Sequence, residues 1–485
     1  MKGLEKNLKK GLVVLLAAFI LLAVYYCYIL FFYSDRWFAN SYNPRVRLDS
    51  WEPKVIPGDI KDRNGKLLAT TVKEKRQNPQ TQQKQVYYYR SYLGGGEQAR
   101  SIAHVVGFNN SQWGRSGVEA LQVKYLMGYN NPFYERVYQK IFLSTEVGNT
   151  LHLTIDLALQ QYIDDVLGSN KGSVVVMNAQ TGEILAMVSH PTFNPNRLEN
   201  IEGDILLNRA TEGLFMPGSV FKVIVAASAL DNLEHISDNI FDCQGEIQTG
   251  SQGISCYGGE SHGQVNLKEA ITVSCNGYFV DTATKLGKEK LLKTAEAFGF
   301  NQDFIFPDLK LAASLLPLKG SVSKEKLALI SIGQGDVQVT PLHMAMIASA
   351  IANDGIMMEP KLVYEVVGRN GKAQVKLQPN IYRKAMSLES ARLIQEMLKN
   401  VVDQGTGKAA ALKGWQVAGK TGTAEISNGE SEIKNNAWFI GFVPGNKSKL
   451  AIAVVLEDLP EGQTGGRMAA PLAGKIFKKA LDLGY

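Results

Sequence analysis

The sequence predicts an α+β chain with a single N-terminal transmembrane helix, a small extended β-rich module, and a larger domain whose central antiparallel sheet is flanked by helices. Three observations predict it: an uncharged apolar stretch near the N-terminus, two strand–turn–strand patterns far apart in the chain, and long helical stretches between them. With 485 residues, 45% hydrophobic and 20% charged, the chain can bury a large core, and it is neither disordered nor fibrous.

The apolar stretch covers residues 11–33 and carries no charged side chain. At about 1.5 Å per residue, a helix of this length crosses a bilayer core of about 30 Å. No small-residue cleavage site follows it, so we expect an uncleaved signal anchor. Lysines outnumber acidic residues before it, which places residues 1–10 in the cytoplasm and the rest of the chain outside. Aromatic residues typical of a membrane interface end the stretch: Tyr25, Tyr26, Phe31, Phe32 and Tyr33.

Beyond the span the composition changes at about residue 150. Residues 34–149 are polar and irregular, with a Gln-rich patch at 77–85, and we expect a smaller extended module there. From Thr150 an alternating strand-like segment leads into residues with apolar side chains at helical spacing. We therefore expect a second domain over residues 150–485.

The second domain begins and ends with predicted hairpins. KGSVVVMNAQTGEILAMVSH contains two β-branched runs joined by a turn at Gln180, Thr181 and Gly182, and NAWFIGFVP is followed by KLAIAVVLED after a turn near Gly445. Helical stretches lie between the two hairpins. Strands at both ends with helices between them favour an antiparallel sheet over a βαβ repeat.

Composition excludes several classes of function. The net charge of +6 is modest and no basic stripe has interleaved aromatics, so we expect no nucleic-acid partner. The histidines are scattered and form no recognised ligand motif with each other or with cysteine, so we expect no metal site and no cofactor. Cys27 lies in the span and Cys275 in a candidate motif. Cys243 and Cys256 remain a candidate disulfide that sequence does not decide.

Ser219 and Lys222 form the first candidate constellation, at the start of an apolar helical stretch. A spacing of three places both groups on one helix face. A serine needs a base within reach, and a lysine serves as one when burial or a second cation lowers its pKa. The free N–H groups of the helix start also favour the negative charge of an acyl-transfer transition state. Alone, such a tetrapeptide is more often an ordinary solvated helix turn.

Ser274 and Asn276 form the second constellation, after another apolar helical run. Both can face one cleft where the chain bends out of a helix, and there the hydroxyl can relay a proton while the amide orients substrate. Taken alone, these residues are ordinary polar caps of a helix end.

Lys420, Thr421, Gly422 and Thr423 form the third constellation, in a segment with strand character. On a strand, Lys420 and Gly422 face one side while the threonines face the other. A glycine permits close approach to the backbone, and a strand edge offers hydrogen bonds to a peptide-like substrate. The N–H groups of Thr423 and Ser219 would form an oxyanion hole.

The same segment contains a nucleotide-binding pattern, G-x-x-x-x-G-K-T, from Gly414 to Thr421. That motif follows a strand and opens a helix, whereas here a helical stretch precedes it and a strand-like TAEIS follows. We therefore reject the nucleotide interpretation.

The order of the three constellations, 55 and then 146 positions apart, resembles that of the penicillin-recognising serine transferases. The stretches NRATEGLFMPGSVFK, SIGQGDVQVTP and GTGKAAALKGWQVAGKTGTAE resemble the surroundings of this family's motifs. Upstream, GDIKDRNGKLLAT and GRSGVEALQVKYLMG resemble blocks of the non-catalytic module in class B, monofunctional penicillin-binding proteins. The first block departs from the family, because Pro57 stands where an arginine is usual, and the module is compact.

The resemblance implies a β-lactamase/transpeptidase-like fold for residues 150–485 and a pedestal or dimerisation-type module for residues 34–149. It implies a peptidoglycan D,D-transpeptidase that crosslinks stem peptides through an acyl-enzyme and is inhibited covalently by β-lactams. Ser219 would be the nucleophile and Lys222 its general base. Ser274 would pass a proton to the leaving amine, and Asn276 would hold the site together.

In the third motif the resemblance implies that Lys420, Thr421 and Thr423 bind the substrate carboxylate, with Gly422 opening the strand edge. No glycan-polymerising domain fits upstream, so a membrane glycan polymerase of the cell-wall machinery is the expected partner. A role in cell shape, in division or in sporulation stays open.

Four other functions share parts of this pattern. A D,D-carboxypeptidase differs in that water resolves the acyl-enzyme. A secreted β-lactamase does not need the anchor or the upstream module. A β-lactam sensor needs a signalling domain, for which ten cytoplasmic residues are too few, and an idle scaffold has no need of three intact motifs.

Overall fold

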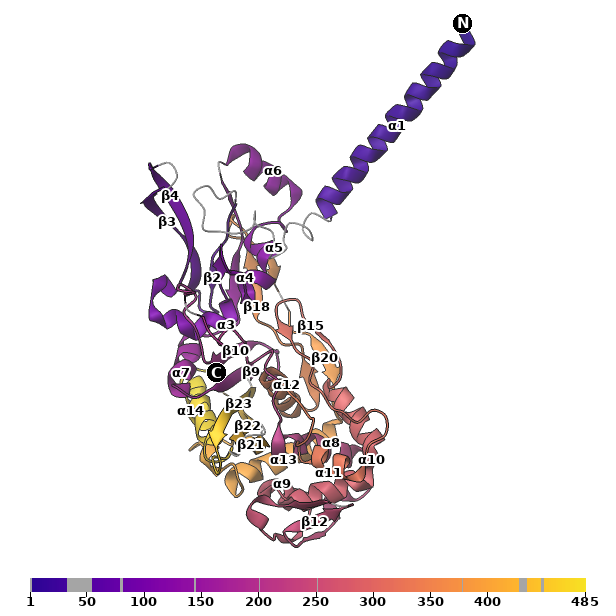
Figure 1. Cartoon of the computed structure of the whole chain (residues 1–485), viewed down its shortest axis with the longest axis vertical. Helices are drawn as coiled ribbons and strands as arrows, with labels where there is room; N and C mark the ends of the chain where they lie inside the picture. The colour runs from indigo at the N-terminus through magenta and orange to yellow at the C-terminus, as the bar shows by residue number, and fades with distance from the viewer. Residues whose placement is uncertain are drawn as a thin grey trace.

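The protein is described here by a computed structural model, which covers residues 2–32, 55–78, 82–143, 145–199, 201–250, 252–376, 378–426, 434–445 and 449–485. Figure 1 shows a long N-terminal helix standing apart from an elongated body of mixed helices and strands. The predicted α+β class is confirmed.

The N-terminal helix α1 runs over Lys2–Phe32. Its apolar part, Lys6–Ile29, is 24 residues long, and none of its most apolar window is buried. At about 1.5 Å per residue this part reaches ~36 Å, more than the hydrocarbon core of about 30 Å. The helix is thus long and apolar enough to cross a membrane. Of the predicted interface aromatics, Tyr25 and Tyr26 are exposed, whereas Tyr33 and the side chains of Phe31 and Phe32 lie outside the described residues.

A central five-stranded antiparallel sheet forms the larger part of the body, in the order β10-β9-β23-β22-β21. Its strands are β9 (Gly172–Asn178), β10 (Ile184–His190), β21 (Ala418–Ile426), β22 (Lys434–Pro444) and β23 (Lys449–Pro460). Both predicted hairpins are confirmed by their paired strands, although the end of the second turn, from residue 446, lies outside the described residues. In the first, the Asn178 side chain accepts hydrogen bonds from the N–H groups of Gln180 and Thr181, and Gly182 has a φ of 79°. The described part of β21 lies at the edge of this sheet.

Helices cover both faces of the central sheet, as predicted, because alternate residues of each strand face opposite cores. Val174 and Val176 are fully buried in one core, against α7 and α14, whereas Val175 and Met177 belong to the other, with α8 and α12. The helices of this domain are α7 (Leu157–Leu167), α8 (Lys222–Asn232), α9 (Leu267–Val273), α10 (Asn276–Phe298), α11 (Lys324–Ser331), α12 (Pro341–Ala352), α13 (Leu388–Asp403) and α14 (Ala469–Asp482).

A second, six-stranded sheet crosses the domain boundary predicted at residue 150. It has the order β19-β18-β8-β2-β3-β4. Its strands are β2 (Ile60–Lys61), β3 (Leu67–Gln77), β4 (Lys84–Tyr92), β8 (Thr150–Leu153), β18 (Val363–Val367) and β19 (Ala373–Lys376). Strand β8 pairs in parallel with β2 and antiparallel with β18, so the upstream module and the larger domain share hydrogen-bonded strands. The domain boundary between residues 149 and 150 therefore stays a prediction. In the structure the two parts are joined by a continuous sheet.

Short elements complete the upstream module, which also contains a buried ion pair. The Arg90 Nε lies 2.6 Å from Glu119 Oε1, and both side chains are 1% exposed. The module's short elements are β1 (Val55–Ile56), α3 (Ala103–Val106), β5 (Asn109–Asn110), β6 (Gly114–Arg115), α4 (Gly117–Leu121), α5 (Val123–Leu126), α6 (Phe133–Phe142) and β7 (Glu146–Val147).

The remaining strands are two-residue to four-residue pieces that form two-stranded ladders around the helices of the larger domain. They are β11 (Phe241–Cys243), β12 (Glu246–Thr249), β13 (Gln252–Ser255), β14 (Gly263–Val265), β15 (Phe304–Ile305), β16 (Lys310–Leu311), β17 (Ile356–Met358) and β20 (Ile381–Lys384). In Figure 1 the ladder that contains β12 lies at the lower end of the body, beside α9.

Candidate active site

Ser219 lies in a single 3₁₀ turn, Gly218–Phe221, that leads directly into α8 at Lys222. A 3₁₀ turn has three residues per turn, so side chains three positions apart lie above one another. Ser219 is half-buried and Lys222 is fully buried. The local fold therefore aligns the two predicted groups along one line of the helix start, with the free N–H groups of that start beside the serine.

Three glycines allow the Ser219 turn to pack between two other segments. A Cβ on Gly218 would lie 2.4 Å from the Thr423 carbonyl oxygen, and one on Gly422 would lie 2.7 Å from the Pro217 oxygen. On the other side, the Gly218 N–H donates to the Gly333 oxygen at 2.9 Å. The backbone of the Ser219 turn is thus in direct contact with the backbone of strand β21 on one side and with that of the SIGQG segment on the other.

Ser274 and Asn276 lie where the chain leaves one helix and starts the next. Ser274 ends α9 in a left-handed conformation, with a φ of 61°, and α10 begins at Asn276. The predicted bend out of a helix is confirmed. The Asn276 Nδ2 donates to the Ser255 oxygen at 2.7 Å, which ties this bend to the end of β13.

Lys420 lies on edge strand β21, as predicted, and its side chain reaches the bend at Ser274. The alternation along β21 is also confirmed. Lys420 and Gly422 face the Ser219 turn and Ser274, whereas the Thr421 hydroxyl meets Thr406 at 2.6 Å and the Thr423 hydroxyl accepts from the Gly465 N–H at 3.2 Å.

A chain of hydrogen bonds joins the three constellations. Lys222 Nζ donates to the Ser274 carbonyl oxygen at 2.7 Å, to Asn276 Oδ1 at 2.6 Å and to Ser274 Oγ at 3.2 Å. Lys420 Nζ donates to the same Ser274 Oγ at 2.9 Å. One hydroxyl therefore bridges two lysines that are 198 positions apart in sequence.

Burial sets the protonation behaviour of both lysines. Removal from water disfavours the ammonium form and lowers the pKa of Lys222 to about 7. Burial, and then the charge of Lys222, hold the pKa of Lys420 well below its usual value. Both lysines hydrogen-bond to one Ser274 hydroxyl, which offers a path for proton transfer between them, and a lowered pKa is the condition that a lysine base requires.

The structure does not bring every predicted group into contact. Within the described residues, the three Lys222 Nζ hydrogen bonds go to Ser274 and Asn276, and none goes to Ser219 Oγ. These three acceptors match the three donors of an ammonium. A neutral amine has one donor fewer and a free lone pair, so loss of a proton would release it to accept from a neighbouring hydroxyl.

Several groups that support the site carry no signal in the sequence. Thr406 contacts Thr421 directly and lies in the GTGKAAALKGWQVAGKTGTAE stretch, but nothing in that stretch singled it out. The Ser255 carbonyl, which accepts from the Asn276 amide, stands in no recognisable motif. Gly333 belongs to SIGQGDVQVTP, a segment that the family resemblance did mark, but its backbone contact with Gly218 had no local signal.

The sequence contains no Cys/His ligand motif, and for this reason it predicts no metal site, but the fold assembles a Cys/His cluster. Ligand atoms of Cys243, Cys256, His262 and Cys275 all lie within 4.8 Å of one another. The residues are scattered along the chain, and the fold of β11, β13, β14 and α10 brings them together. Cys243 and Cys256 are not bridged: their sulfur atoms are 3.7 Å apart. A disulfide requires about 2.05 Å.

The local fold also excludes a nucleotide-binding loop at Gly414–Thr421. Gly419, Lys420 and Thr421 lie inside strand β21, and no helix opens at this point. A phosphate-binding loop needs the N–H groups of a helix start there.

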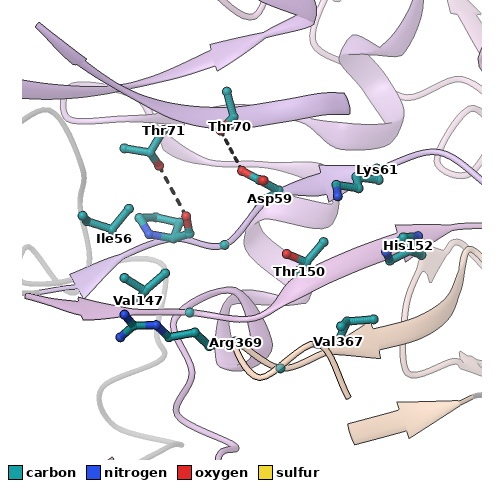
Figure 2. A pocket seen from close by; sticks show the side chains of 15 residues that line it. Ile56, Asp59, Lys61, Thr70, Thr71, Val147, Thr150, His152, Val367 and Arg369 are labelled. Carbon is teal, nitrogen blue, oxygen red and sulfur yellow. Dashed lines mark hydrogen bonds between the residues drawn. The ribbon is translucent and has the colours of Figure 1, made fainter. Parts of the chain in front are cut away.

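A cavity of about 360 Å³ lies elsewhere, where β1, β2, β7 and β8 meet β18. Figure 2 shows Lys61, His152 and Arg369 around it, and the hydrogen bond from Thr70 to Asp59 at 2.6 Å on its wall. None of its lining residues belongs to the three constellations. The candidate active site is therefore defined by its hydrogen bonds and not by this cavity.

Comparisons with known proteins agree with this arrangement. The family described as "Penicillin binding protein transpeptidase domain" matches residues 172–478. The peptidoglycan D,D-transpeptidase PbpA of Mycolicibacterium smegmatis is 32% identical over 480 residues, which cover 93% of this chain and 94% of that protein.

Two solved structures are similar over most of the chain. The D,D-transpeptidase domain of a peptidoglycan glycosyltransferase from Eggerthella lenta superposes with a TM-score of 0.76 at 33% identity, covering 89% of this chain and 99% of that one. Penicillin-binding protein A from M. tuberculosis, as its penicillin G acyl-enzyme, gives a TM-score of 0.78 at 29% identity, covering 88% and 99%.

Proposed function

Because the chain belongs to the penicillin-binding protein transpeptidase family, we propose that it is a peptidoglycan D,D-transpeptidase whose nucleophile is Ser219. The observation that carries this proposal is the hydrogen-bond chain from Lys222 through Ser274 to Lys420, which gathers all three constellations beside the Ser219 turn. The named relatives supply the reaction class, and the residues of this chain supply the roles that follow.

Acylation begins when a neutral Lys222 amine takes the proton of the Ser219 hydroxyl. The oxygen bonds to the carbonyl carbon between the two terminal D-alanines of a stem peptide. The pKa of about 7 supports this role for Lys222, because a large share of the amine is then neutral near physiological pH. Backbone N–H groups of Ser219 and Thr423, on segments in close contact, would hold the oxyanion.

Collapse of the tetrahedral intermediate breaks the peptide C–N bond. Ser274 passes a proton to the departing D-alanine nitrogen and recovers one from Lys222, to which it is already hydrogen-bonded. An acyl ester on Ser219 remains. An amine from a neighbouring stem peptide then attacks the ester carbonyl and gives up its proton through the same groups, and the ester bond breaks to leave an amide crosslink and the free serine.

The substrate carboxylate would bind along the edge of β21. Lys420 is fully buried and points at Ser274, so it contributes positive potential rather than a solvent-exposed contact. The hydroxyls of Thr421 and Thr423 each keep hydrogen-bonding capacity beyond the single partner described above. Gly422 lets the substrate backbone approach the strand closely. A β-lactam would imitate the same D-alanyl-D-alanine end and acylate Ser219.

The transpeptidase assignment is tested with the full-length chain in detergent, a synthetic stem pentapeptide ending in D-Ala-D-Ala, and a free D-amino acid as acceptor. We expect D-alanine release together with an exchanged peptide, and neither product from Ser219→Ala. Ser321→Ala, which changes an exposed serine, should behave as wild type. If the only product is the shortened tetrapeptide, the enzyme is a carboxypeptidase and the proposal fails.

We further propose that α1 anchors the chain in the cell membrane by a single span, with residues 1–10 in the cytoplasm and the catalytic domain outside. The apolar character of Lys6–Ile29 and the lysines before it support this topology. Protease added outside spheroplasts should digest the body and leave a small fragment. A chain that stays whole until the membrane is opened would contradict the orientation.

The expected partner is a membrane glycan polymerase that supplies the glycan strands to be crosslinked. The support is structural: the transpeptidase family model matches residues 172–478, and the upstream strands β2, β3 and β4 share a sheet with the larger domain. Crosslinking in intact membranes followed by affinity purification of this chain should recover a polymerase. Recovery of the chain alone, at full yield, would argue against such a complex.

A further inference from the structure

The cluster of Cys243, Cys256, His262 and Cys275 has the geometry of a metal site. We propose that these four residues bind one Zn²⁺ ion in a tetrahedral Cys₃His site that braces the Ser274–Asn276 bend. The inference concerns binding and does not depend on the proposed transpeptidase activity.

The distances between the ligand atoms carry the argument. Tetrahedral zinc with Zn–S bonds of about 2.3 Å and a Zn–N bond of about 2.0 Å holds two sulfurs ~3.8 Å apart and a sulfur and a nitrogen ~3.5 Å apart. In the structure, Cys243 Sγ lies 3.7 Å from Cys256 Sγ and 3.5 Å from His262 Nδ1, and Cys256 Sγ lies 3.9 Å from Cys275 Sγ. Three of the six separations thus match those that one zinc ion requires, and the other three are at most 4.8 Å, so a small inward shift of the side chains completes the tetrahedron.

The surroundings of the sulfurs favour thiolates. The Asn276 N–H donates to Cys256 Sγ at 3.3 Å, and the Tyr278 N–H donates to Cys275 Sγ at 3.4 Å. Both donors belong to the first turn of α10, whose positive end favours negative charge. Hydrogen bonds of this kind orient metal ligands and stabilise their deprotonated form.

The ligand set selects the metal. Three thiolates and one imidazole in a tetrahedral arrangement suit zinc, whereas calcium and magnesium prefer oxygen ligands. Four protein ligands leave no open position, which is the pattern of a structural site and not of a catalytic one. The three cysteines are buried and His262 is half-buried, so the imidazole marks the side from which an ion can enter.

The ligands connect four elements that would otherwise be held by short ladders. Cys243 ends β11, Cys256 follows β13, His262 precedes β14, and Cys275 caps the N-terminus of α10. Cys275 lies between Ser274 and Asn276 in the sequence. Cys256 follows Ser255, whose backbone oxygen accepts a hydrogen bond from the Asn276 side-chain amide. The ion is therefore a positioning element: it holds the bend that presents Ser274 and Asn276 to Lys222.

Cysteines outside the cytoplasm often form disulfides, and this is the main competing outcome. One bridge would leave the third thiol and His262 unexplained. Disulfide geometry also needs one sulfur pair to approach to about 2.05 Å, which the present arrangement does not show.

The test uses the full-length chain, purified in detergent without added metal, with metal content measured by mass spectrometry. We expect about one zinc ion per chain in the wild type and in Cys27→Ser, which changes the cysteine in α1. His262→Ala alters a half-buried residue, so it should fold. It should lower zinc affinity by more than the roughly 10- to 100-fold that loss of an outer hydrogen-bond partner costs.

A spectroscopic measurement on the wild-type chain tests the site without relying on the folding of a variant. Wild-type chain stripped of metal and given Co²⁺ should show intense visible bands of a tetrahedral ion and thiolate-to-cobalt charge transfer. Three results would overturn the proposal. The first is iron instead of zinc in the purified chain, and the second is an intact mass lower by the two hydrogen atoms that a disulfide loses. The third is that the stripped and reduced chain takes up neither zinc nor cobalt. Penicillin labelling of the same samples reports the transpeptidase separately, so each assignment can fail without the other.

Discussion

Replacing Gly218 by alanine tests whether the Ser219 turn and strand β21 must touch. Gly218 has a φ of 56°, and a Cβ there would lie 2.4 Å from the Thr423 carbonyl oxygen. Ordinary van der Waals contact begins near 3.4 Å, so the two backbones must separate by roughly 1 Å. A carbonyl in a sheet strand has no rotamer by which to yield.

The expected loss follows from the proposed oxyanion hole. Ser219 and Thr423 each supply one N–H group, and a shift of about 1 Å between them should slow acylation by ~10²-fold. The assay is the second-order rate of labelling by a fluorescent penicillin, measured with the full-length chain in detergent. Thermal unfolding of the same samples shows how much protein is folded.

Gly65→Ala is the matched control. Gly65 has a φ of 81° but no heavy atom within 4 Å of the added Cβ. Both substitutions carry the left-handed penalty of about 1–2 kcal/mol, and only Gly218→Ala adds the clash. Equal acylation rates for the two folded variants would refute the argument that the backbone contact assembles the oxyanion hole.

Three further predictions address the lysine, the upstream module and the bend. The acylation rate should rise as pH increases through about 7 and then level off, because burial lowers the pKa of Lys222 to about 7 and only the neutral amine accepts a proton; labelling rates over a pH series measure this. Arg90→Met should lower the free energy of unfolding by about 3–5 kcal/mol in a urea titration, because Glu119 is left buried without its partner, while Arg90→Met/Glu119→Leu should cost far less. Asn276→Ala should slow penicillin labelling roughly 10- to 100-fold, since hydrogen bonds to Lys222 and to the Ser255 oxygen are lost.

Each of these has an outcome that contradicts it. A rate that stays constant from mildly acidic to neutral pH would remove Lys222 as the base. Equal destabilisation by the single and double changes at Arg90 and Glu119 would show that the unpaired charge of Glu119 is not the cause of the loss. Unchanged labelling of Asn276→Ala would mean that the amide does not position Lys222.

Local pattern was enough to predict the central sheet and the three constellations. The hairpin around Gln180 combines β-branched runs with an Asn and a Gly that suit a tight turn, so nothing distant is needed to recognise it. Each constellation stands beside an apolar segment whose hydrophobic periodicity identifies it as a helix or a strand. This periodicity places Ser219 at a helix start, Ser274 at a helix end and Lys420 on a strand.

Contacts between distant segments could not be predicted in the same way. Strand β18 pairs with β8 across more than two hundred positions, and nothing in either short segment specifies that partner. The same holds for the Cys243–Cys275 region, where four ligands come from four elements with no recognised zinc spacing. Thr406 contacts Thr421 only because α13 ends beside β21.

The most direct test of the central claim is the site of covalent attachment by penicillin. Full-length wild type and Ser219→Ala are incubated with benzylpenicillin, their intact masses are followed over time, and the modified peptide is mapped. The account predicts one slowly lost adduct on Ser219 in the wild type and none in the variant. An adduct on another residue, or an equal adduct on Ser219→Ala, would contradict it.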